Sequence, residues 1–447
     1  MPLTDARPWP SCLSWGTLLL VLATAGCTSA IVIGGSVDRA RSERIYSAIE
    51  QMRGLSFGSE VALVAMNPAQ ANVILEREVT ARHNDAALAR AAEIGAMTGL
   101  YAPGTDLKAQ TMHLLTSQVA GFYDPEDREM ILIEGREPNS LISGLADLFR
   151  RGDSNDRMLI AHELTHALQD QYFDIHAALD RIRDDDDRQL ALKAVAEGDA
   201  TLAAYGYVKD GFGADKIDAL LSHLDDMPRL VDAESPGTPE ALRESLIFQY
   251  AAGTRFVSEA YRRGGWSAVN ALYARPPTST RQVIDPTAYF DDPSPPVAIT
   301  LRGFQRALKG WRPVEHNTYG ELLVQVILRR NPSDEPQVSL ARGWRGDRMV
   351  VLQSGSALTV IWIVVLRDEE TATAFARVYG GILDRISPGV TSFHRVNCHG
   401  DAVLAAIGPG AERFGNFAPA VWRETIIGRA PATGETRLRA AVEIPPA

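Results

Sequence analysis

Apolar residues recur at helical spacing through much of the chain. The segments ERIYSAIEQMRGL and DAALARAAEIGAMTGLYAPG place apolar residues three and four positions apart, and proline and glycine close the second, so both predict helices. EVALVAM predicts a strand, and GFYDPEDREMILI predicts a hairpin because turn-forming residues separate two extended runs. Residues 154–262 have mainly helical spacing, which makes helix the dominant element.

The pattern changes toward the C-terminal end. A proline-rich stretch at 276–298 predicts an ordered loop, whereas RRNPSDEPQVSLARG predicts a domain boundary. After it, RMVVLQ, LTVIWIVVL and VLAAIG predict strands around the helix EETATAFARVYGGIL, which indicates an antiparallel sheet with a helix. We therefore predict an α+β protein with a mainly helical domain over 27–340, a small C-terminal α/β lobe over 341–430 and a tail over 431–447.

The N-terminal segment has the pattern of an export signal. An arginine precedes an apolar run over 13–26, which is too short for a membrane-spanning helix. Small residues then precede Cys27, and this arrangement resembles the lipobox of bacterial lipoproteins, in which the signal is removed and the cysteine receives lipid. We predict a lipoprotein-type signal peptide over 1–26. An ordinary secretory signal or a short buried helix is the alternative.

The cysteines fit this prediction. Cys12 would leave with the signal and Cys27 would carry lipid, so Cys398 alone remains and no intramolecular disulfide is expected. Thr28 stands where an aspartate commonly retains lipoproteins at the inner membrane. We therefore expect an exported protein that is anchored to the membrane through its lipid, on the periplasmic face of the outer membrane if the source is Gram-negative.

The amino-acid composition and the net charge bear mainly on which binding partners are expected. The chain has 447 residues, 45% of them hydrophobic, and a formal net charge of -11, which is ordinary for a globular protein. Nucleic-acid binding would need a basic stripe, and we expect no nucleic-acid partner. The acidity is otherwise consistent with solubility.

The segment LIAHELTHALQDQ contains the residues of a metal site. His162 and His166 are four residues apart, so on a helix both imidazoles lie on one face, about one turn apart. This is the spacing of two zinc ligands, and Glu163 can reach a metal-bound water without being a ligand. Polar residues at 154–156 can cap the helix. The sequence therefore predicts zinc bound by His162 and His166, with Glu163 as the catalytic base.

A catalytic zinc site needs a third protein ligand. The best candidate is Glu197, which lies in LALKAVAEGDATLAAYGY, a second predicted helix. Its neighbours are small, so two helices could approach closely enough for its carboxylate to reach the metal. Burying this glutamate among apolar residues would be costly without a partner such as zinc. A solvent-facing glutamate is the alternative.

These residues resemble a known class of enzymes. AHELTHALQDQYFD together with AVAEGDA is similar to the gluzincin class of zinc metallopeptidases, the thermolysin-like group, and to a poorly characterised bacterial set of exported proteins within it. GFYDPEDREMILI, PPTSTRQVIDPTAYF and HNTYGELLVQVIL are similar to segments that accompany the motif in that set, so the resemblance spans roughly residues 45–425. It implies a zincin-like metallopeptidase fold, hydrolysis of peptide bonds, and a peptide or protein as substrate.

The resemblance also suggests further residues. Tyr123, His316 and Tyr319 lie in the similar segments and are candidates for the donor that stabilises the oxyanion. Thermolysin-like enzymes place an aspartate four residues after the glutamate ligand to orient a histidine, but here Thr201 holds that place and Asp199 is the candidate instead. Asp285 stands where we expect a histidine.

Two other expectations follow. The strand REMILI is predicted to be the sheet edge that pairs with an extended substrate. The acidic run at 184–187 lacks the spacing of a calcium loop and is expected to stabilise the N-terminus of the Glu197 helix.

A non-proteolytic zinc-binding scaffold or assembly protein of the envelope is the alternative function. A scaffold does not need Glu163, so we favour the peptidase.

Overall fold

The structure is a computed structural model. It describes residues 32–33, 36–37, 39–82, 84–118, 121–134, 154–234, 236–331, 337–386 and 393–428. The predicted signal peptide, the lipidation site Cys27 and the predicted tail lie outside the described residues. Within the described ranges, no helix is both long and apolar enough to cross a membrane.

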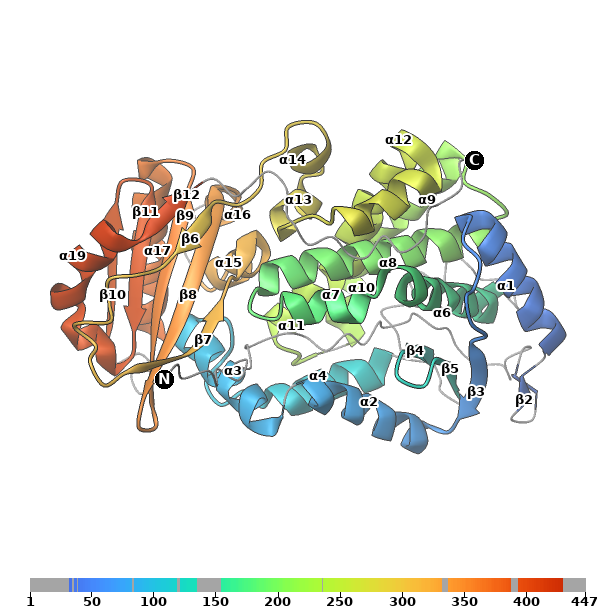
Figure 1. Ribbon diagram of the computed structural model, residues 1–447, viewed down its shortest axis with the longest axis horizontal. Helices are drawn as coiled ribbons and strands as arrows, with labels where there is room; N and C mark the ends of the chain where they lie inside the picture. Colours follow the sequence, from blue (N-terminus) through green and yellow to red (C-terminus); the bar gives the residue numbers. More distant parts are fainter. Residues whose placement is uncertain are drawn as a thin grey trace, which may run out of the picture.

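The chain is an α+β protein, as predicted, with a mainly helical part beside a C-terminal sheet (Figure 1). The N-terminal elements are β1 (Val32–Ile33), β2 (Ser36–Val37), α1 (Arg39–Arg53), β3 (Ala62–Met66), α2 (Pro68–Arg82), α3 (Asp85–Thr98), α4 (Leu107–Gln118), β4 (Gly121–Asp124) and β5 (Glu129–Ile133). The central helices are α6 (Ser154–Phe173), α7 (Ile175–Arg181), α8 (Asp186–Val208), α9 (Ala214–Leu224), α10 (Met227–Glu234), α11 (Glu240–Ile247), the π-helical turn η1 (Phe248–Ala252) and α12 (Gly253–Ala274).

The predicted proline-rich loop is ordered and contains two short helices. These are α13 (Thr280–Ile284) and α14 (Thr287–Phe290), and Asp285 between them accepts hydrogen bonds from the backbone N–H and the hydroxyl of Thr287. The remaining elements are β6 (Ala298–Thr300), β7 (Arg312–Asn317), α15 (Gly320–Leu328), α16 (Gln337–Arg342), β8 (Trp344–Ser354), β9 (Ala357–Leu366), α17 (Glu369–Arg385), β10 (His394–His399), β11 (Ala402–Ile407), the 3-10 turn η2 (Pro409–Arg413), α19 (Phe414–Glu424) and β12 (Ile426–Gly428).

Helix α8 is the centre of the helical part, and it is buried along most of its length (Figure 1). Its start agrees with the expectation for the acidic run, because the side chain of Asp185 caps it by accepting from the N–H of Arg188, and Asp186 and Asp187 stand in its first turn. Asp187 also accepts hydrogen bonds from the backbone N–H and the hydroxyl of Thr280. The acidic run therefore joins α8 to α13.

Small residues bring α8 against the start of α12, whereas the sequence analysis expects the small neighbours of Glu197 to serve its approach to the helix of His162 and His166. A methyl group on Gly198 would lie 2.3 Å from the backbone of Gly253, and one on Gly253 would lie 2.1 Å from the carbonyl oxygen of Ala194. Neither glycine can accept a side chain without moving a helix. The close approach places the turn η1 beside Glu197.

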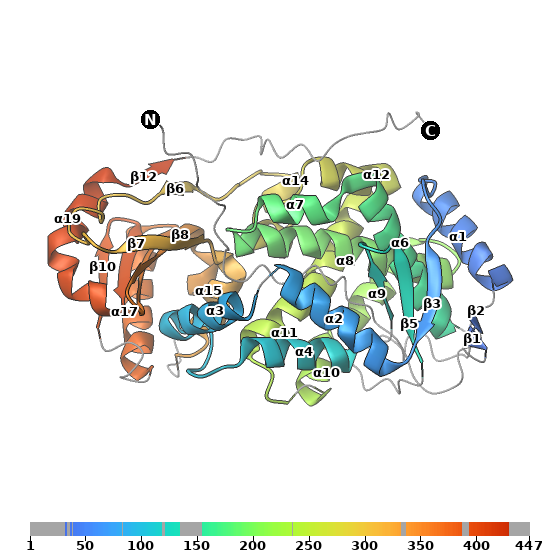
Figure 2. The ribbon, with the colours of Figure 1, turned by 60° about the horizontal axis from the view of Figure 1, so that its bottom comes forward.

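A small sheet of strand order β3-β5-β4 lies beside α6 (Figure 2). β4 and β5 form the predicted antiparallel hairpin, but β3 pairs with β5 in parallel on its other side. The REMILI segment is therefore the central strand, and the prediction that it forms the sheet edge is wrong. Among the described strands, β4 is the edge strand on the side of α6.

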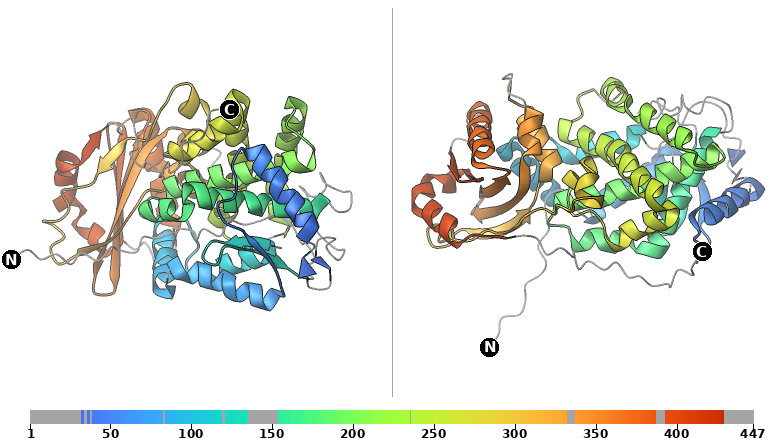
Figure 3. Two further views of the ribbon diagram at one scale, coloured as in Figure 1. Left: turned by 45° about the vertical axis from the view of Figure 1, so that its right-hand side comes forward. Right: turned by 90° about the horizontal axis from the view of Figure 1, so that it is seen from above.

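The C-terminal sheet has the order β10-β11-β9-β8-β7 and is antiparallel throughout, as predicted. Figure 3 shows this part of the chain in orange and red from two further sides. Its residues alternate between two cores: Trp362 and Val364 pack with α17, while Ile361 and Ile363 pack with α19. β7 belongs to this sheet, so the sheet begins before residue 341, where the sequence placed the start of the lobe.

Candidate metal centre

Three of the predicted site residues meet inside the helical part. His162 and His166 come from α6 and Glu197 comes from α8, and their ligand atoms all lie within 4.8 Å of one another. The two histidine Nε2 atoms are 2.9 Å apart, and Oε2 of Glu197 lies 3.3 Å from His162 Nε2 and 3.6 Å from His166 Nε2. All three side chains are buried.

One of the three ligand atoms lacks a hydrogen-bond partner. The two imidazole Nε2 atoms contact each other at 2.9 Å, whereas the buried Oε2 of Glu197 accepts no hydrogen bond within the described ranges. Leaving a buried carboxylate oxygen without a partner costs free energy. A metal ion between two nitrogens and one carboxylate oxygen fits these residues, so the site could hold a metal.

The electrostatics of the metal-free site suit a ligand set. Burial lowers the pKa of His162 to about 4, so its imidazole is neutral at pH 7 and has a lone pair to donate. Burial alone would raise the pKa of Glu197, but the two histidines outweigh it and hold the pKa at about 2. The site therefore offers a neutral imidazole and a carboxylate, as metal coordination requires.

Glu163 stands beside this group without joining it. Its Oε2 accepts a hydrogen bond of 2.7 Å from the backbone N–H of Tyr123 on β4, and its buried Oε1 has no partner in the described part of the chain. Burial, followed by the charge of Glu197, raises the pKa of Glu163 well above its usual range, against the opposing hydrogen bond from Tyr123. A carboxylate with a free, buried oxygen is suited to proton transfer.

Asp199 lies behind His166 but does not touch it. His166 Nδ1 is 2.8 Å from Oε1 of Gln169, and Nε2 of Gln169 donates to Oδ2 of Asp199 at 3.1 Å. Asp199 also accepts hydrogen bonds from Arg53 at 2.9 Å and from the hydroxyl of Tyr273 at 2.8 Å. The aspartate therefore contacts the histidine through Gln169.

The three candidate oxyanion donors are placed differently. The hydroxyl of Tyr123 turns toward Asp170, at 3.2 Å, and only its backbone reaches Glu163. The hydroxyl of Tyr319 pairs with Thr98 at 3.0 Å, and its ring packs on Trp362. His316 is on β7 and lines a cavity of about 500 Å³. None of the three presents its side chain to Glu163 in the contacts of the described residues.

Tyr250, which the sequence analysis missed, is at the site instead. Its ring stacks on the imidazole of His162 with centroids 6.2 Å apart, and its buried hydroxyl forms no well-aligned hydrogen bond among the residues that the structure describes. Burial raises its pKa well above the usual range, and the charge of the nearby Glu197 and the interaction of the hydroxyl with that carboxylate raise it further. Tyr250 is thus a proton donor at all ordinary pH values. It lies in η1, and π-helical turns are frequent at functional sites.

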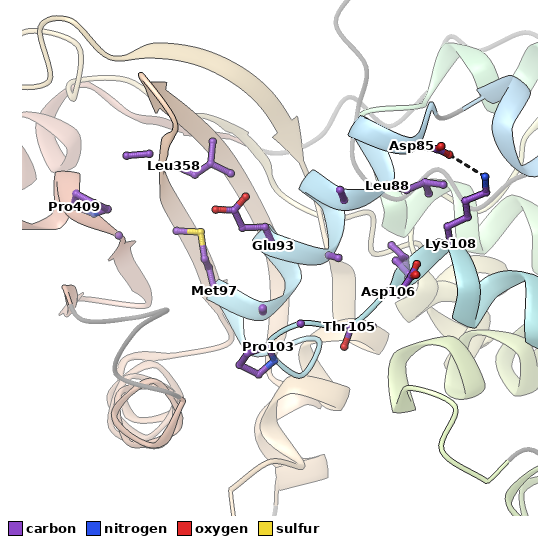
Figure 4. Close-up of a pocket in the computed structure, with 17 residues that line it drawn as sticks. Asp85, Leu88, Glu93, Met97, Pro103, Thr105, Asp106, Lys108, Leu358 and Pro409 are labelled. Carbon is purple, nitrogen blue, oxygen red and sulfur yellow. Dashed lines mark ion pairs between the residues drawn. The ribbon is translucent and has the colours of Figure 1, made fainter.

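A separate cavity of about 740 Å³ lies between α3, the segment that follows it, the start of β9 and the residues after β11 (Figure 4). Glu93, Met97 and Leu358 line it, and Lys108 pairs with Asp85 at 3.0 Å. None of its lining residues belongs to the metal centre.

Comparisons with known proteins give little beyond this geometry. Residues 305–414 match a family described as a domain of unknown function, DUF8575. No curated protein matches the chain. The crystal structure of a proposed hydrolase with a novel fold from Chloroflexus aurantiacus matches 57% of this chain and 89% of its own, at 15% identity and a TM-score of 0.38.

Proposed function

We propose that the chain is a zinc-dependent metallopeptidase of the gluzincin type. The observation that carries this proposal is the buried group of His162, His166 and Glu197 beside Glu163, whose Oε1 is free. Two imidazoles and one carboxylate form a common set of protein ligands at catalytic zinc sites, where the fourth position is left to water. Zinc is the metal that this donor set favours over the oxygen-seeking cations.

Each residue has a role in the proposed reaction. Zinc, when bound, lowers the pKa of a coordinated water and polarises the scissile carbonyl. Oε1 of Glu163 takes the proton of the attacking water and later gives it to the amine as the C–N bond breaks. The N–H of Tyr123 holds the other oxygen of Glu163, so the free oxygen keeps its direction during the transfer.

The position of β4 supports a peptide as substrate. β4 is the edge strand of its sheet, and the Tyr123 N–H that reaches Glu163 lies on the side that β5 does not use. An extended peptide that pairs with this edge would run past the general base. The substrate-pairing role that the sequence assigned to REMILI thus passes to the neighbouring strand in this proposal. The predicted lipid on Cys27 would anchor the enzyme to the membrane after export.

Tyr250→Phe is expected to reduce peptide hydrolysis by about 10²-fold, because its protonated hydroxyl lies in the buried site beside His162 and Glu197 and can donate to the developing oxyanion. Zinc content should be unchanged, since Tyr250 is not among the three ligands. The measurement is kcat/KM together with metal content. Tyr319→Phe is the matched control, as its hydroxyl pairs with Thr98 and should contribute nothing to turnover. Equal activity of the Tyr250 variant and the wild type would remove Tyr250 from the mechanism.

The direct test of the proposed function is metal analysis and proteolysis with the purified chain from residue 28 onward. We expect about one zinc per chain, hydrolysis of unfolded protein or peptide libraries, loss of hydrolysis on chelation and recovery with added zinc. Protein that binds no zinc when purified without chelators would overturn the proposal. Zinc without any hydrolysis would favour the envelope scaffold.

A further inference from the structure

A chain of polar contacts leads from the end of α1 to the metal centre. Arg53, the last residue of α1, donates from Nη2 to Oδ2 of Asp199 at 2.9 Å. The same oxygen accepts from Tyr273 and from Gln169, and Gln169 contacts Nδ1 of His166. All of these side chains are buried. The contacts therefore connect an N-terminal helix to a metal ligand without passing through solvent.

The charge of Arg53 fixes the first step. A guanidinium is always protonated and can only donate hydrogen bonds, and Arg53 is 1% exposed. Its ion pair with Asp199 and its position 4.3 Å above the ring of Trp266 offset part of the cost of its burial. Because a guanidinium can only donate, Oδ2 of Asp199 is the acceptor in this contact.

The polarity of Asp199 fixes the orientation of Gln169. The amide nitrogen of Gln169 faces two groups that can only accept, Oδ2 of Asp199 at 3.1 Å and the carbonyl oxygen of Ala196 at 2.9 Å. Rotating the amide by half a turn would set oxygen against oxygen at both contacts. The oxygen of Gln169 must therefore face His166.

The orientation of Gln169 fixes the tautomer of His166. An amide oxygen cannot donate, so the contact of 2.8 Å requires the proton on Nδ1 of His166. The lone pair is then on Nε2, which is the atom that faces His162 and Glu197. Only this tautomer can bind a metal at that point.

We infer that Arg53, Asp199 and Gln169 are positioning residues that hold His166 in its metal-binding tautomer before any metal arrives. We call these three residues the relay. The inference rests on the proposed metal centre. It connects docking of α1 to the formation of the site, because the guanidinium that donates to Asp199 comes from α1. His162 serves as an internal comparison, since its Nδ1 has no hydrogen-bond partner within the described ranges.

The test is long-range nitrogen–proton NMR of the metal-free chain with labelled histidine, combined with zinc titration. In the wild type we expect His166 to carry its proton on Nδ1. Gln169→Met removes the acceptor while two donors to Asp199 remain, so His166 should populate the other tautomer and zinc affinity should fall by about 10- to 100-fold.

Two control variants separate this effect from a general loss of structure. Gln171→Met makes the same substitution two residues later on α6, where the amide holds the backbone at 58 and 59. Tyr273→Phe removes one donor to Asp199 but leaves the polarity of the relay unchanged. Both should keep the tautomer and bind zinc within about threefold of wild type, a change smaller than the smallest effect expected for a relay residue.

The outcomes distinguish this inference from the proposed function. A wild-type His166 protonated on Nε2 would overturn it, as would a folded Gln169→Met protein with unchanged tautomer and zinc affinity. The NMR measurement needs neither metal nor turnover, so the relay can be confirmed in a protein that hydrolyses nothing. Conversely, an active zinc peptidase whose His166 samples both tautomers would refute the relay alone.

Discussion

Glu163→Gln is expected to leave zinc bound and to lower kcat for peptide hydrolysis by about 10³-fold. The side chain lies beside the three ligands without being one, so the metal should remain. The amide oxygen can still accept from the N–H of Tyr123, which keeps the side chain in place. What is lost is the basic oxygen, and a positioned general acid–base contributes about 10²- to 10⁴-fold.

The measurement is kcat and zinc per chain for the variant and the wild type under the same conditions. Glu163→Asp is the matched control, since it keeps the carboxylate but withdraws it by one methylene, and it should retain more activity than the amide. Loss of zinc from the Gln variant would mean that Glu163 is a ligand. Full activity with zinc bound would place the proton transfer on another residue and end the proposed mechanism.

The sequence predicted those parts of the site that follow from a single helix. His162 and His166 share a face because of the helical period, and Glu163 must then stand beside them. Glu197 was predicted from the cost of burying a carboxylate among small apolar residues, and Gly198 shows why the neighbours are small. Local period and burial cost are properties of a short segment, which is why a sequence can reveal them.

The residues that support the site could not be found in this way. Tyr250 and Arg53 reach the site across helix contacts, and the helical period shows which face is buried but not what lies opposite. Gln169 is one turn after His166 on α6, but the contacts that set the direction of its amide come from α8. Arg53 in particular ends a helix where a charged residue is normally exposed. Its burial depends on an acceptor 146 positions later in the chain.

The same limit explains the differences in the sheets. The hairpin of β4 and β5 follows from its turn, but β3 joins the sheet from a distant segment and makes β5 central. β7 lacks an apolar alternation, because Glu315 and Asn317 are buried polar residues. Asn317 donates to Asp186 at 2.8 Å, so the polar pattern of β7 is matched to the acidic start of α8.

Glu197→Ala is expected to weaken zinc binding by more than about 100-fold and to abolish hydrolysis. Changes to groups that only orient a ligand cost about 10- to 100-fold in affinity, so losing the only carboxylate of the group must cost more. Thr201→Ala is the matched control one turn later on α8, where a buried hydroxyl without a hydrogen-bond partner among the described residues is removed, and it should bind zinc normally. Isothermal titration with zinc measures both variants.

Thermal unfolding gives an independent test of whether Glu197 is a zinc ligand. Zinc that binds only the folded chain stabilises it by RT ln(1 + [Zn]/Kd), which is about 4 kcal/mol at a thousandfold excess over Kd. Chelation should therefore lower the Tm of wild type and of Thr201→Ala, but lower the Tm of Glu197→Ala much less, because a Kd raised at least 100-fold leaves at most about 1.4 kcal/mol of stabilisation at the same zinc concentration. A chelator-induced drop in Tm as large in Glu197→Ala as in wild type would show that a residue other than Glu197 completes the site, and with it the ligand set that distinguishes a gluzincin would be wrong.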